Sequence, residues 1–523
     1  MSTQVAIRRL ATGVPGLDEV LGGGLPEYSF NLIAGQPGCG KTTLAHQIMF
    51  ALATPERPAI YFTVLGEPPL KMLRYQQQFG FFDSEAINRS VRFISLSADA
   101  VSGDLDRALQ RIEDEVAMLS PGLVFVDSFR SVVQASEING NANHGLQQFV
   151  QRLGMLMTSW QATTFLIGEY IDETDANPVF TVSDGLIWLR QSVQRNSMVR
   201  KIEVLKMRGQ ASLAGLHSFR ITSEGVEVYP PASIGIGKPD QPGAEGATAA
   251  GKASQAAPPR LSTGTPGLDA MLGGGLPRSY SLLVAGPSGS GKSILAAAFL
   301  AEGARCGETG VIAAFEQPPN RSRSRVVADL IQSGAVGLVD NRHADTSIDE
   351  VLFKLLREIR RLNASRVVID SLSGFELTLA PTFREDFRES LSRLVSTLAG
   401  VGVTVLMTSE LEDRYTDLRF SPYGTAFMTD AIIVQRYIEV QSRLRRVMAV
   451  VKVRASEHSN ELREYTIGDD GIRLGAMLAD QEGLLGGKPT QNPAQAPTRE
   501  PPQEPQQEAP QAPAQGAVHS LAT

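Results

Sequence analysis

Two short segments carry the residue types and spacing needed to bind the phosphates of a nucleotide. GQPGCGKT at 35–42 and GPSGSGKS at 286–293 both fit the pattern GxxxxGK[ST], and each follows an apolar run and precedes a helical pattern. Glycines let the backbone wrap around phosphates with its amide groups facing them, and the helix N-terminus adds favourable partial charge. The residues expected at the phosphates are Gly35, Gly38, Gly40, Lys41, Thr42, Thr43, Gly286, Gly289, Gly291, Lys292 and Ser293.

The lysine and the hydroxyl residue of each segment have separate roles. Lys41 and Lys292 are expected to contact the β- and γ-phosphates of ATP, and Thr42 and Ser293 are expected to supply a hydroxyl ligand to Mg²⁺. The alternative is a glycine-rich turn that fits the pattern by chance. Two copies in the right context argue against it, so ATP and Mg²⁺ are the predicted cofactors.

An aspartate ends an apolar run downstream of each glycine-rich segment. The runs are GLVFVD, which ends at Asp127, and RVVID, which ends at Asp370. A carboxylate at the end of a strand beside the phosphate-binding strand is placed to hold Mg²⁺ through water, as Walker B residues do. The alternative is an aspartate that caps the following helix.

Hydrolysis also needs a group that orients or deprotonates the attacking water. The candidates are Glu67 and Glu316, which end the runs YFTVLGE and IAAFE after the helix of each glycine-rich segment. A proline soon follows each of them, which predicts that the strand stops there and that the carboxylate faces a cleft. The alternative is a surface glutamate at a strand end.

The chain repeats itself over a long distance. TGVPGLDEVLGGGLP at 12–26 returns as TGTPGLDAMLGGGLP at 263–277, an offset of 251 residues that Lys41 and Lys292 also keep. A repeat of this size indicates duplicated domains rather than a solenoid. We expect domains at 1–230 and 259–480, joined by a Pro-, Gly- and Ala-rich linker at 231–258. Residues 481–523 have almost nothing to bury and are expected to be a disordered tail.

Within each copy, short apolar runs alternate with longer helical patterns. FNLIAG, AIYFTV, GLVFVD and TTFLIG are the apolar runs of the first copy. Fully apolar strands separated by helices indicate a parallel sheet that is covered on both faces. Both halves are therefore predicted to be α/β domains with a mainly parallel sheet flanked by helices.

Composition narrows the function classes. The net charge of −7 argues against nucleic acid as a partner, and the N-terminus and the rest of the chain lack an apolar run of about 18 residues for a membrane. Two cysteines, Cys39 and Cys306, supply neither a disulfide framework nor a four-cysteine zinc site. We expect a cytoplasmic protein without membrane contact, in which His46 is structural or exposed to solvent.

With these motifs, the chain resembles the KaiC family of ATPases over roughly 8–230 and 259–475. The most specific elements are the repeated TGxPGLDxxLGGGLP, DSF and DSL at the strand-ending aspartates, LIGEY at 166–170, and KMRG and KVRA near the domain ends. The resemblance implies two tandem RecA-like P-loop NTPase domains that form a homo-hexameric double ring with ATP between subunits.

In such a ring, basic residues reach the nucleotide of a neighbouring subunit. The resemblance implies this role for Lys206 with Arg208, and for Lys452 with Arg454. An arginine supplied by a neighbour stabilises the charge of the transition state. The alternative is a set of basic residues on an exposed strand edge.

The sequence departs from the family pattern at two places. Family members carry adjacent glutamates after the strand that follows the P-loop; domain 2 keeps the first as Glu316, whereas Glu67 of domain 1 is displaced by one residue. Family autokinases phosphorylate a Ser-Thr pair, and the matching positions are Ala426 and Phe427, with Thr425 and Thr429 nearby. Both departures weaken a direct transfer of the family's activities.

Four functions remain in competition. The first is an ATP-hydrolysing hexameric switch that a protein partner reads, in bacterial signalling or regulation. The second is a Ser/Thr autokinase with Glu316 as its base, and the third is a recombinase-like ATPase acting on DNA. The fourth is a nucleotide-bound scaffold with little turnover. The fold alone does not decide among them.

Overall fold

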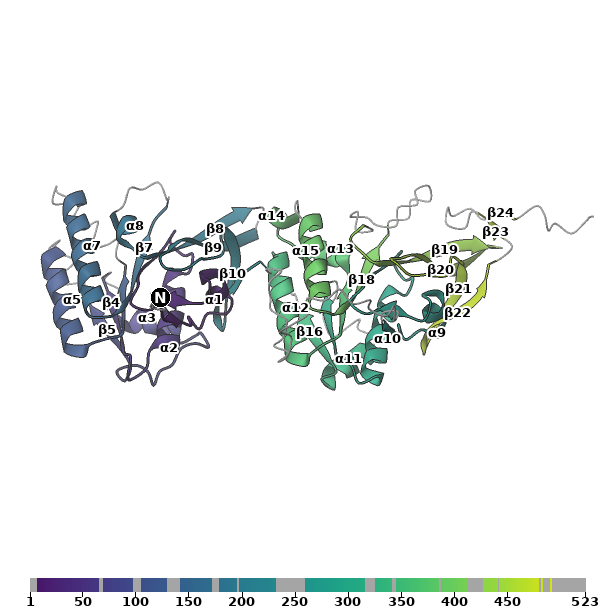
Figure 1. Cartoon of the computed structure of the whole chain (residues 1–523), viewed down its shortest axis with the longest axis horizontal. Helices are drawn as coiled ribbons and strands as arrows, with labels where there is room; N and C mark the ends of the chain where they lie inside the picture. The colour runs from purple at the N-terminus through teal and green to yellow at the C-terminus, as the bar shows by residue number, and fades with distance from the viewer. Residues whose placement is uncertain are drawn as a thin grey trace, which may run out of the picture.

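The computed structural model shows two α/β domains that follow one another along the chain (Figure 1). It describes residues 7–64, 69–96, 105–128, 142–171, 178–194, 197–231, 259–315, 325–340, 345–384, 387–411, 427–440, 442–478, 481–482 and 490–491. The predicted fold class of two mainly parallel sheets flanked by helices is confirmed. Glu67, Glu316, nearly all of the expected linker and most of the expected tail lie outside the described residues.

Domain 1 alternates strands and helices and ends in a run of strands. Its strands are β1 (Arg9–Leu10), β2 (Leu25–Pro26), β3 (Phe30–Gly35), β4 (Ala59–Thr63), β5 (Val91–Ser95), β6 (Leu123–Asp127), β7 (Thr163–Glu169), β8 (Gly185–Gln194), β9 (Ser197–Met207), β10 (Leu216–Thr222) and β11 (Gly225–Tyr229). Its helices are α1 (Leu17–Leu21), α2 (Lys41–Leu52), α3 (Pro69–Gln76), α5 (Leu105–Leu119), α7 (Ala142–Ser159) and α8 (Pro178–Val182).

The large sheet of domain 1 has nine strands in the order β11-β10-β9-β8-β3-β7-β6-β4-β5. The six strands from β8 to β5 are parallel, and β9, β10 and β11 continue the sheet as antiparallel neighbours. Helices α1 and α2 bury one face, whereas α5 and α7 bury the other. Burial on both faces explains why β3, β4 and β6 consist mostly of apolar residues and are buried along almost their whole length.

Domain 2 repeats this plan. Its strands are β12 (Arg260–Leu261), β13 (Leu276–Pro277), β14 (Ser281–Gly286), β15 (Gly310–Ala314), β16 (Val336–Asp340), β17 (Arg366–Asp370), β18 (Thr404–Glu410), β19 (Ala431–Val440), β20 (Arg443–Val453), β21 (Arg463–Gly468), β22 (Gly471–Met477), β23 (Gln481–Glu482) and β24 (Thr490–Gln491). Its helices are α9 (Pro266–Met271), α10 (Lys292–Arg305), α11 (Arg325–Gln332), α12 (Ile348–Leu362), α13 (Leu372–Thr378), α14 (Pro381–Arg384) and α15 (Phe387–Gly400).

The nine-stranded sheet of domain 2 has the order β16-β15-β17-β18-β14-β19-β20-β21-β22. Its strands correspond one by one to those of domain 1, whose order is given above from the opposite edge of the sheet. Helices α9, α10 and α11 cover one face, and α12, α13 and α15 cover the other. In the part of the chain that is described, no helix is both long and apolar enough to span a lipid bilayer.

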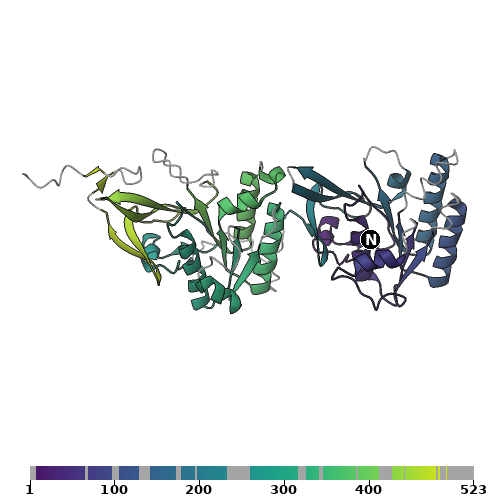
Figure 2. The same cartoon turned by 180° about the vertical axis from the view of Figure 1, so that it is seen from behind.

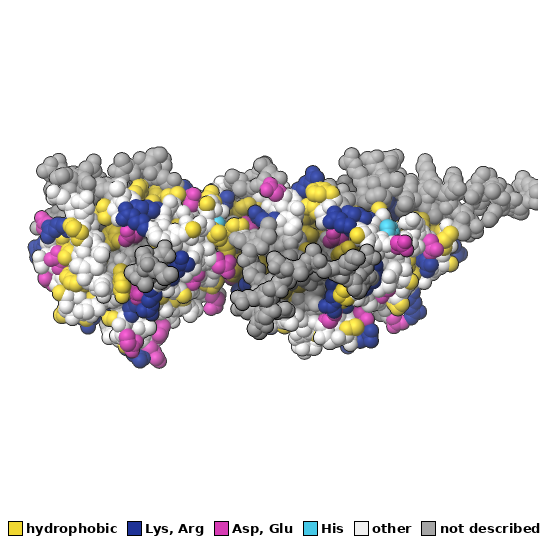
Figure 3. Space-filling model, in the orientation of Figure 1, with side chains coloured by type: hydrophobic (Ala, Val, Ile, Leu, Met, Phe, Trp, Pro, Cys, Tyr) yellow, Lys and Arg dark blue, Asp and Glu magenta, His cyan; other side chains and the backbone are white. Residues whose placement is uncertain are grey.

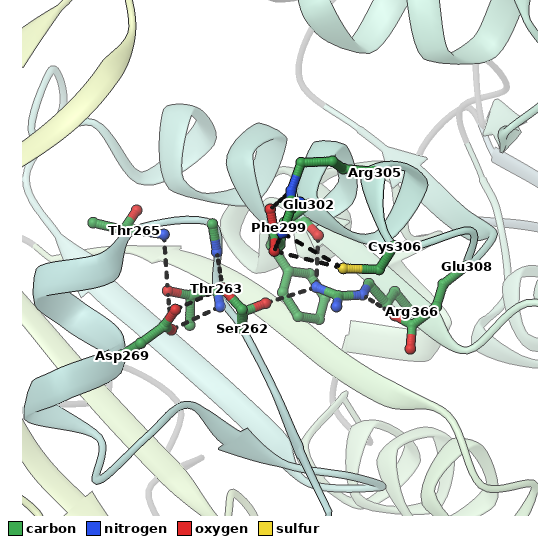
Figure 4. Close-up of polar contacts among 11 residues, drawn as sticks. Ser262, Thr263, Thr265, Asp269, Phe299, Glu302, Arg305, Cys306, Glu308 and Arg366 are labelled. Atoms are coloured by element: carbon green, nitrogen blue, oxygen red, sulfur yellow. Dashed lines mark hydrogen bonds and ion pairs between the residues drawn. The ribbon is translucent and has the colours of Figure 1, made fainter.

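The repeated TGxPGLD segment has a structural role in both domains. The backbone amide and hydroxyl of Thr12 donate to Asp18 Oδ1 at 2.9 and 2.7 Å. Thr263 makes the same pair of bonds to Asp269 Oδ1 at 2.8 and 2.7 Å (Figure 4). A Cβ atom on Gly16 would lie 1.9 Å from a backbone oxygen of β11, which explains this glycine. The threonine–aspartate pair therefore closes this segment on itself in both domains, and Gly16 lets it lie directly against β11 in domain 1.

In domain 2 a buried arginine holds the residue that precedes this segment (Figure 4). Arg366, at the start of β17, is 2% exposed and donates to Glu308 Oε2 at 2.7 Å. It also donates to the carbonyl oxygens of Ser262 and Phe299, both at 2.8 Å, and its guanidinium lies over the Phe299 ring. A buried charge is tolerated only when it is paired and hydrogen-bonded, as here. Arg366 thus ties the repeated segment, α10 and β17 together.

The two domains meet where β10 and β11 of domain 1 face α12 of domain 2, as Figures 1 and 2 both show. At the centre is Glu350, whose side chain is 2% exposed. It accepts from Arg220 of β10 at 2.6 Å and from Lys354 of its own helix at 2.6 Å. The rings of Tyr229 and Phe353 pack in a T-shaped contact beside this ion pair. The interface is therefore organised around one buried carboxylate with two cations.

We expect Glu350→Gln to lower the thermal unfolding midpoint by about 5 °C or more, because the variant leaves two partly buried cations without a counter-charge. The matched control is Glu358→Gln on the same helix, whose pair with the exposed Arg361 should contribute less than about 1 kcal/mol. Differential scanning calorimetry measures both. Equal shifts in the two variants would contradict the assigned importance of the interdomain ion pair.

Candidate nucleotide sites

Glycines shape the loop between each first strand and the helix that follows it. Gly40, the N-cap of α2, has a φ of 105°, in the left-handed region that favours glycine. A Cβ atom on Gly35 would lie 2.1 Å from the carbonyl oxygen of Leu189 in β8. Gly291 occupies the matching N-cap of α10 with a φ of 97°. Both loops therefore reach a helix N-terminus with a backbone that no side chain obstructs, which is the arrangement that binds phosphate.

The remaining glycines of the pattern lie in the same loops. Gly38 and Gly289 have φ values of 76° and 75°, so the two loops turn in the same way. Gly286 ends β14, and a Cβ atom there would lie 2.9 Å from the Gln435 side chain of β19. The structure thus places all the predicted glycines on two equivalent loops.

Each P-loop lysine folds back over its own loop. Lys41 Nζ donates to the carbonyl oxygen of Gln36 at 2.8 Å, and Lys292 Nζ donates to those of Gly286 and Pro287, both at 2.8 Å. Lys41 is 6% exposed, so its charge is largely removed from bulk water. An ammonium group held in this position is suited to the phosphates of a nucleotide.

The strand-ending aspartate of domain 1 lies beside the hydroxyl of the P-loop. Thr42 Oγ1 donates to Asp127 Oδ2 at 2.8 Å, and the hydroxyl of Tyr61 donates to the same oxygen at 2.6 Å. Burial raises the pKa of Asp127, although these two hydrogen bonds act in the opposite direction. Burial and the neighbouring Asp127 carboxylate raise the pKa of Tyr61 well above 10. The sequence predicted Thr42 and Asp127 at one site but missed Tyr61.

Domain 2 holds its aspartate in a different way. Thr408 Oγ1, from β18, donates to Asp370 Oδ1 at 2.5 Å. Ser293 lies in the first turn of α10 and is exposed. The two aspartates occupy equivalent ends of β6 and β17, because Asp127 pairs with Thr63 and Asp370 with Ala314 across matching strands. The carboxylate position is therefore shared, whereas its hydrogen-bond donor is not.

A cavity of about 460 Å³ opens over the P-loop of domain 1. Its polar wall contains Lys41, Thr42, Thr43, Asp127 and Glu169. Its apolar wall contains Met72, Phe79 and Ile221. The cavity thus combines a phosphate-binding end with apolar surface that suits a base.

Glu169 is a second carboxylate in this cavity that had no assigned role from sequence. It ends β7, which lies between β3 and β6, and its charge contributes to the raised pKa of Asp127. The signal that led to Asp127, an acidic residue at the end of an apolar strand, applies equally to the TTFLIGE run. That rule alone would have identified Glu169.

The oxygen atoms around Thr42 suit magnesium. Mg²⁺ is bound in such sites by one or two protein oxygens together with substrate phosphates and water, rather than by a cage of several carboxylates. The Thr42 hydroxyl and the Asp127 carboxylate meet this description. Among the described residues, no group of three or more His, Cys, Asp and Glu side chains forms a metal cage. Thr42 and Asp127 therefore suit a magnesium ion that is bound together with a nucleotide.

The basic pairs near the domain ends do not face the P-loop of their own domain. Lys206 pairs with Leu186, which lies beside Leu32, three residues before the P-loop begins at Gly35. Lys206 Nζ donates to the carbonyl oxygens of Phe180 and Thr181 at 3.3 and 3.1 Å. Burial lowers the pKa of Lys206. This lysine is therefore directed toward the opposite end of the parallel strands.

The other three basic residues are held similarly. Arg208 pairs with Asp184 at 3.1 Å, and Arg454 pairs with Asp430 at 3.1 Å. Lys452 Nζ donates to the carbonyl oxygen of Thr429 at 2.7 Å. Both arginine side chains are more than half exposed, at 60% and 57%. The same arrangement in both domains presents a guanidinium at the surface, away from the domain's own nucleotide loop.

The positions discussed for self-phosphorylation are only partly described. Thr425 and Ala426 lie outside the described residues, as do the candidate catalytic residues Glu67 and Glu316. Phe427 is 54% exposed, and Arg388 lies 4.6 Å above its ring. Thr429 is fully buried. In this conformation the Thr429 hydroxyl is not presented to solvent.

Comparison with known proteins agrees with this geometry. The family model "ATPase: KaiC" matches the chain twice, at residues 10–233 and 261–478. The chain is 26% identical over 499 residues to the circadian clock oscillator protein KaiC of Picosynechococcus, which covers 93% of both chains. KaiC of Rippkaea orientalis is 25% identical over 504 residues, or 94% of this chain and 93% of that one. KaiC 1 of Synechocystis is 26% identical over 499 residues, or 93% and 92%. The chain belongs to the KaiC family of ATPases.

Proposed function

We propose that each domain binds ATP with Mg²⁺ and that the protein hydrolyses ATP as a homo-hexameric switch in bacterial signalling or regulation. The observation that carries this proposal is the juxtaposition of a P-loop lysine, a hydroxyl and a buried carboxylate, with Thr42 and Asp127 2.8 Å apart beside Lys41. In domain 2 the same roles fall to Lys292, Ser293 and Asp370. We place the functional units at 1–230 and 259–480, the linker at 231–258, and the protein in the cytoplasm.

Bound Mg²⁺ would neutralise charge that develops on the phosphates. Thr42 would ligate the ion, Asp127 would hold it through water, and Lys41 would contact the β- and γ-phosphates. The amide groups of the P-loop would orient the phosphate chain for attack. These roles need no movement of the sheet, because all three side chains already line one cavity.

Assembly into a ring is supported by the direction of the basic pairs. Lys206 and Arg208 point away from the P-loop of their own domain, and Lys452 and Arg454 repeat this arrangement. In a ring, this surface would meet the nucleotide loop of the next subunit, where an arginine stabilises transition-state charge. A protein partner would then read the nucleotide state of the ring.

Two alternatives have less support. A DNA-acting ATPase would need a basic surface, but the net charge is −7, and acidic and basic side chains are interspersed over the face shown in Figure 3. A Ser/Thr autokinase would need a hydroxyl near the second nucleotide site. Ala426 and Phe427 replace the family's acceptor positions, and Thr429 is buried.

Intact-mass spectrometry after incubation with ATP separates the switch from the autokinase. We expect no stoichiometric mass increase of one phosphate. Stoichiometric phosphate on Thr425 or Thr429 that disappears in Lys292→Ala would make the protein a kinase.

We expect Lys41→Ala and Lys292→Ala each to abolish tight ATP binding at one site, because no other side chain replaces the point charge at the β- and γ-phosphates. Nucleotide content should fall from two ATP per chain to one in either variant. Release of bound nucleotide followed by chromatography measures this ratio. An unchanged ratio in both variants would show that the P-loops are not the nucleotide sites.

We expect ATP with Mg²⁺ to promote assembly into a ring and Arg208→Ala or Arg454→Ala to weaken it, since each arginine would lose its contact with a neighbour's phosphates. Light scattering coupled to size exclusion measures the mass. The control is Arg361→Ala, which removes an exposed arginine of α12. A monomer that holds ATP at both sites would contradict the role across a subunit boundary.

We expect Glu316→Gln to reduce hydrolysis in domain 2 by about 10²–10⁴-fold, the range typical of a general base. Glu67→Gln should have a smaller effect, because a one-residue displacement on a strand directs a side chain to the opposite face. Phosphate release is measured in a Lys41→Ala chain for Glu316 and in a Lys292→Ala chain for Glu67. A larger loss from Glu67→Gln would reverse this assignment.

A further inference from the structure

The two domains support their strand-ending aspartates with hydroxyl groups from different strands. We propose that Tyr61 in domain 1 and Thr408 in domain 2 are positioning residues that orient Asp127 and Asp370 for Mg²⁺, so that each domain sets its metal affinity separately. This inference rests on the proposed binding of Mg²⁺ with ATP. Neither residue belongs to the P-loop or to the strand that carries the aspartate.

Tyr61 is held rigidly beneath Asp127. It is fully buried in β4, and its hydroxyl donates to Asp127 Oδ2 at 2.6 Å. The rings of His46, Phe93 and Phe125 surround it, with centroids at 4.5, 5.5 and 5.9 Å. Contacts with these three rings therefore position the phenol beside Asp127 in the absence of a metal.

In domain 2 the position that corresponds to Tyr61 lacks a hydroxyl group, and a residue of another strand supplies the hydroxyl instead. The residue equivalent to Tyr61 is Ile312, which pairs with Val368 of β17 as Tyr61 pairs with Phe125 of β6. An isoleucine donates no hydrogen bond. Thr408 supplies the hydroxyl instead, at 2.5 Å from Asp370 Oδ1.

The exchange is reciprocal. The residue of domain 1 that matches Thr408 is Ile167, because Ile167 lies beside Ile33 in the sheet as Thr408 lies beside Val284. Each domain thus combines one hydroxyl residue with one isoleucine at these two positions. The buried packing alone does not require a hydroxyl at either place, since the other domain fills each position with an isoleucine that is 0% or 6% exposed.

The hydrogen bond from Tyr61 has a specific use when Mg²⁺ binds. Thr42 and Tyr61 both donate to Asp127 Oδ2. If the Thr42 hydroxyl turns to ligate the ion, Tyr61 keeps the carboxylate in place. Groups that hold a metal ligand in this way typically contribute 10–100-fold in metal affinity. Tyr61 therefore acts through Asp127 and does not touch the metal.

The test measures how the affinity for a fluorescent ATP analogue depends on Mg²⁺ concentration. A Lys292→Ala chain restricts binding to domain 1. There, Tyr61→Phe should raise the Mg²⁺ concentration for half-maximal binding by about 10–100-fold, while the affinity in EDTA changes less than about twofold. Thr408→Val in a Lys41→Ala chain should have the same effect on domain 2.

A rescue variant separates positioning from packing. Ile167→Thr, added to Tyr61→Phe, gives domain 1 the donor that domain 2 uses and should restore the Mg²⁺ dependence. Ile167→Val has the shape of threonine without the hydroxyl and should not restore it. Calorimetry should show cooperative unfolding for all three chains, with the midpoints of the two Ile167 variants about 2–6 °C below that of Tyr61→Phe, because each removes buried methylene volume.

An unchanged Mg²⁺ dependence in Tyr61→Phe would overturn the inference, and so would equal rescue by Ile167→Val and Ile167→Thr. Both results presuppose that the parent binds the analogue more tightly with Mg²⁺. A parent chain without Mg²⁺-dependent binding would instead refute the proposed function. The two failures are therefore distinguishable.

Discussion

The close approach of strands β8 and β10 to the P-loop is the constraint on which the proposed nucleotide site of domain 1 depends. A Cβ atom on Gly35 would meet the Leu189 carbonyl oxygen of β8, and one on Gly40 would lie 2.6 Å from Ile221 of β10. The loop must therefore consist of bare backbone at these points. Strands β8 and β10 thus form the wall that shapes this loop.

Strand β10 connects this wall with the second domain. Successive residues of a strand point to opposite sides. Ile221 accordingly packs against Gly40 of the P-loop, whereas the preceding residue, Arg220, reaches Glu350 in α12 of domain 2. One strand therefore contacts both the nucleotide loop of the first domain and the buried ion pair between the domains. A shift of β10 would change both contacts, because neighbouring residues of this one strand make them.

The two halves of the duplicated scaffold share the conformation of the P-loop and the bonds of the repeated segment, and they differ in the side chains that support the strand-ending aspartates. Thr12–Asp18 and Thr263–Asp269 make the same bonds, and both P-loops turn through glycines with similar φ values. The hydroxyl groups that donate to the two aspartates differ, because Tyr61 donates to Asp127 and Thr408 donates to Asp370. The proposed phosphate binding would rely on backbone geometry that both domains share, whereas the proposed metal positioning would rely on side chains that differ between them.

The sequence by itself determined the fold class, the two P-loops and the pairing of each with a strand-ending aspartate. These features are local: GxxxxGK[ST] specifies its own loop, and an apolar run specifies a buried strand. Tyr61 could not be assigned in this way, because its contact with Asp127 depends on the order of strands in the sheet. The direction of Lys206 was likewise decided only by the pairing of β9 with β8, which turns it away from its own P-loop. Contacts between distant strands form only when the sheet assembles, so only the tertiary structure decided them.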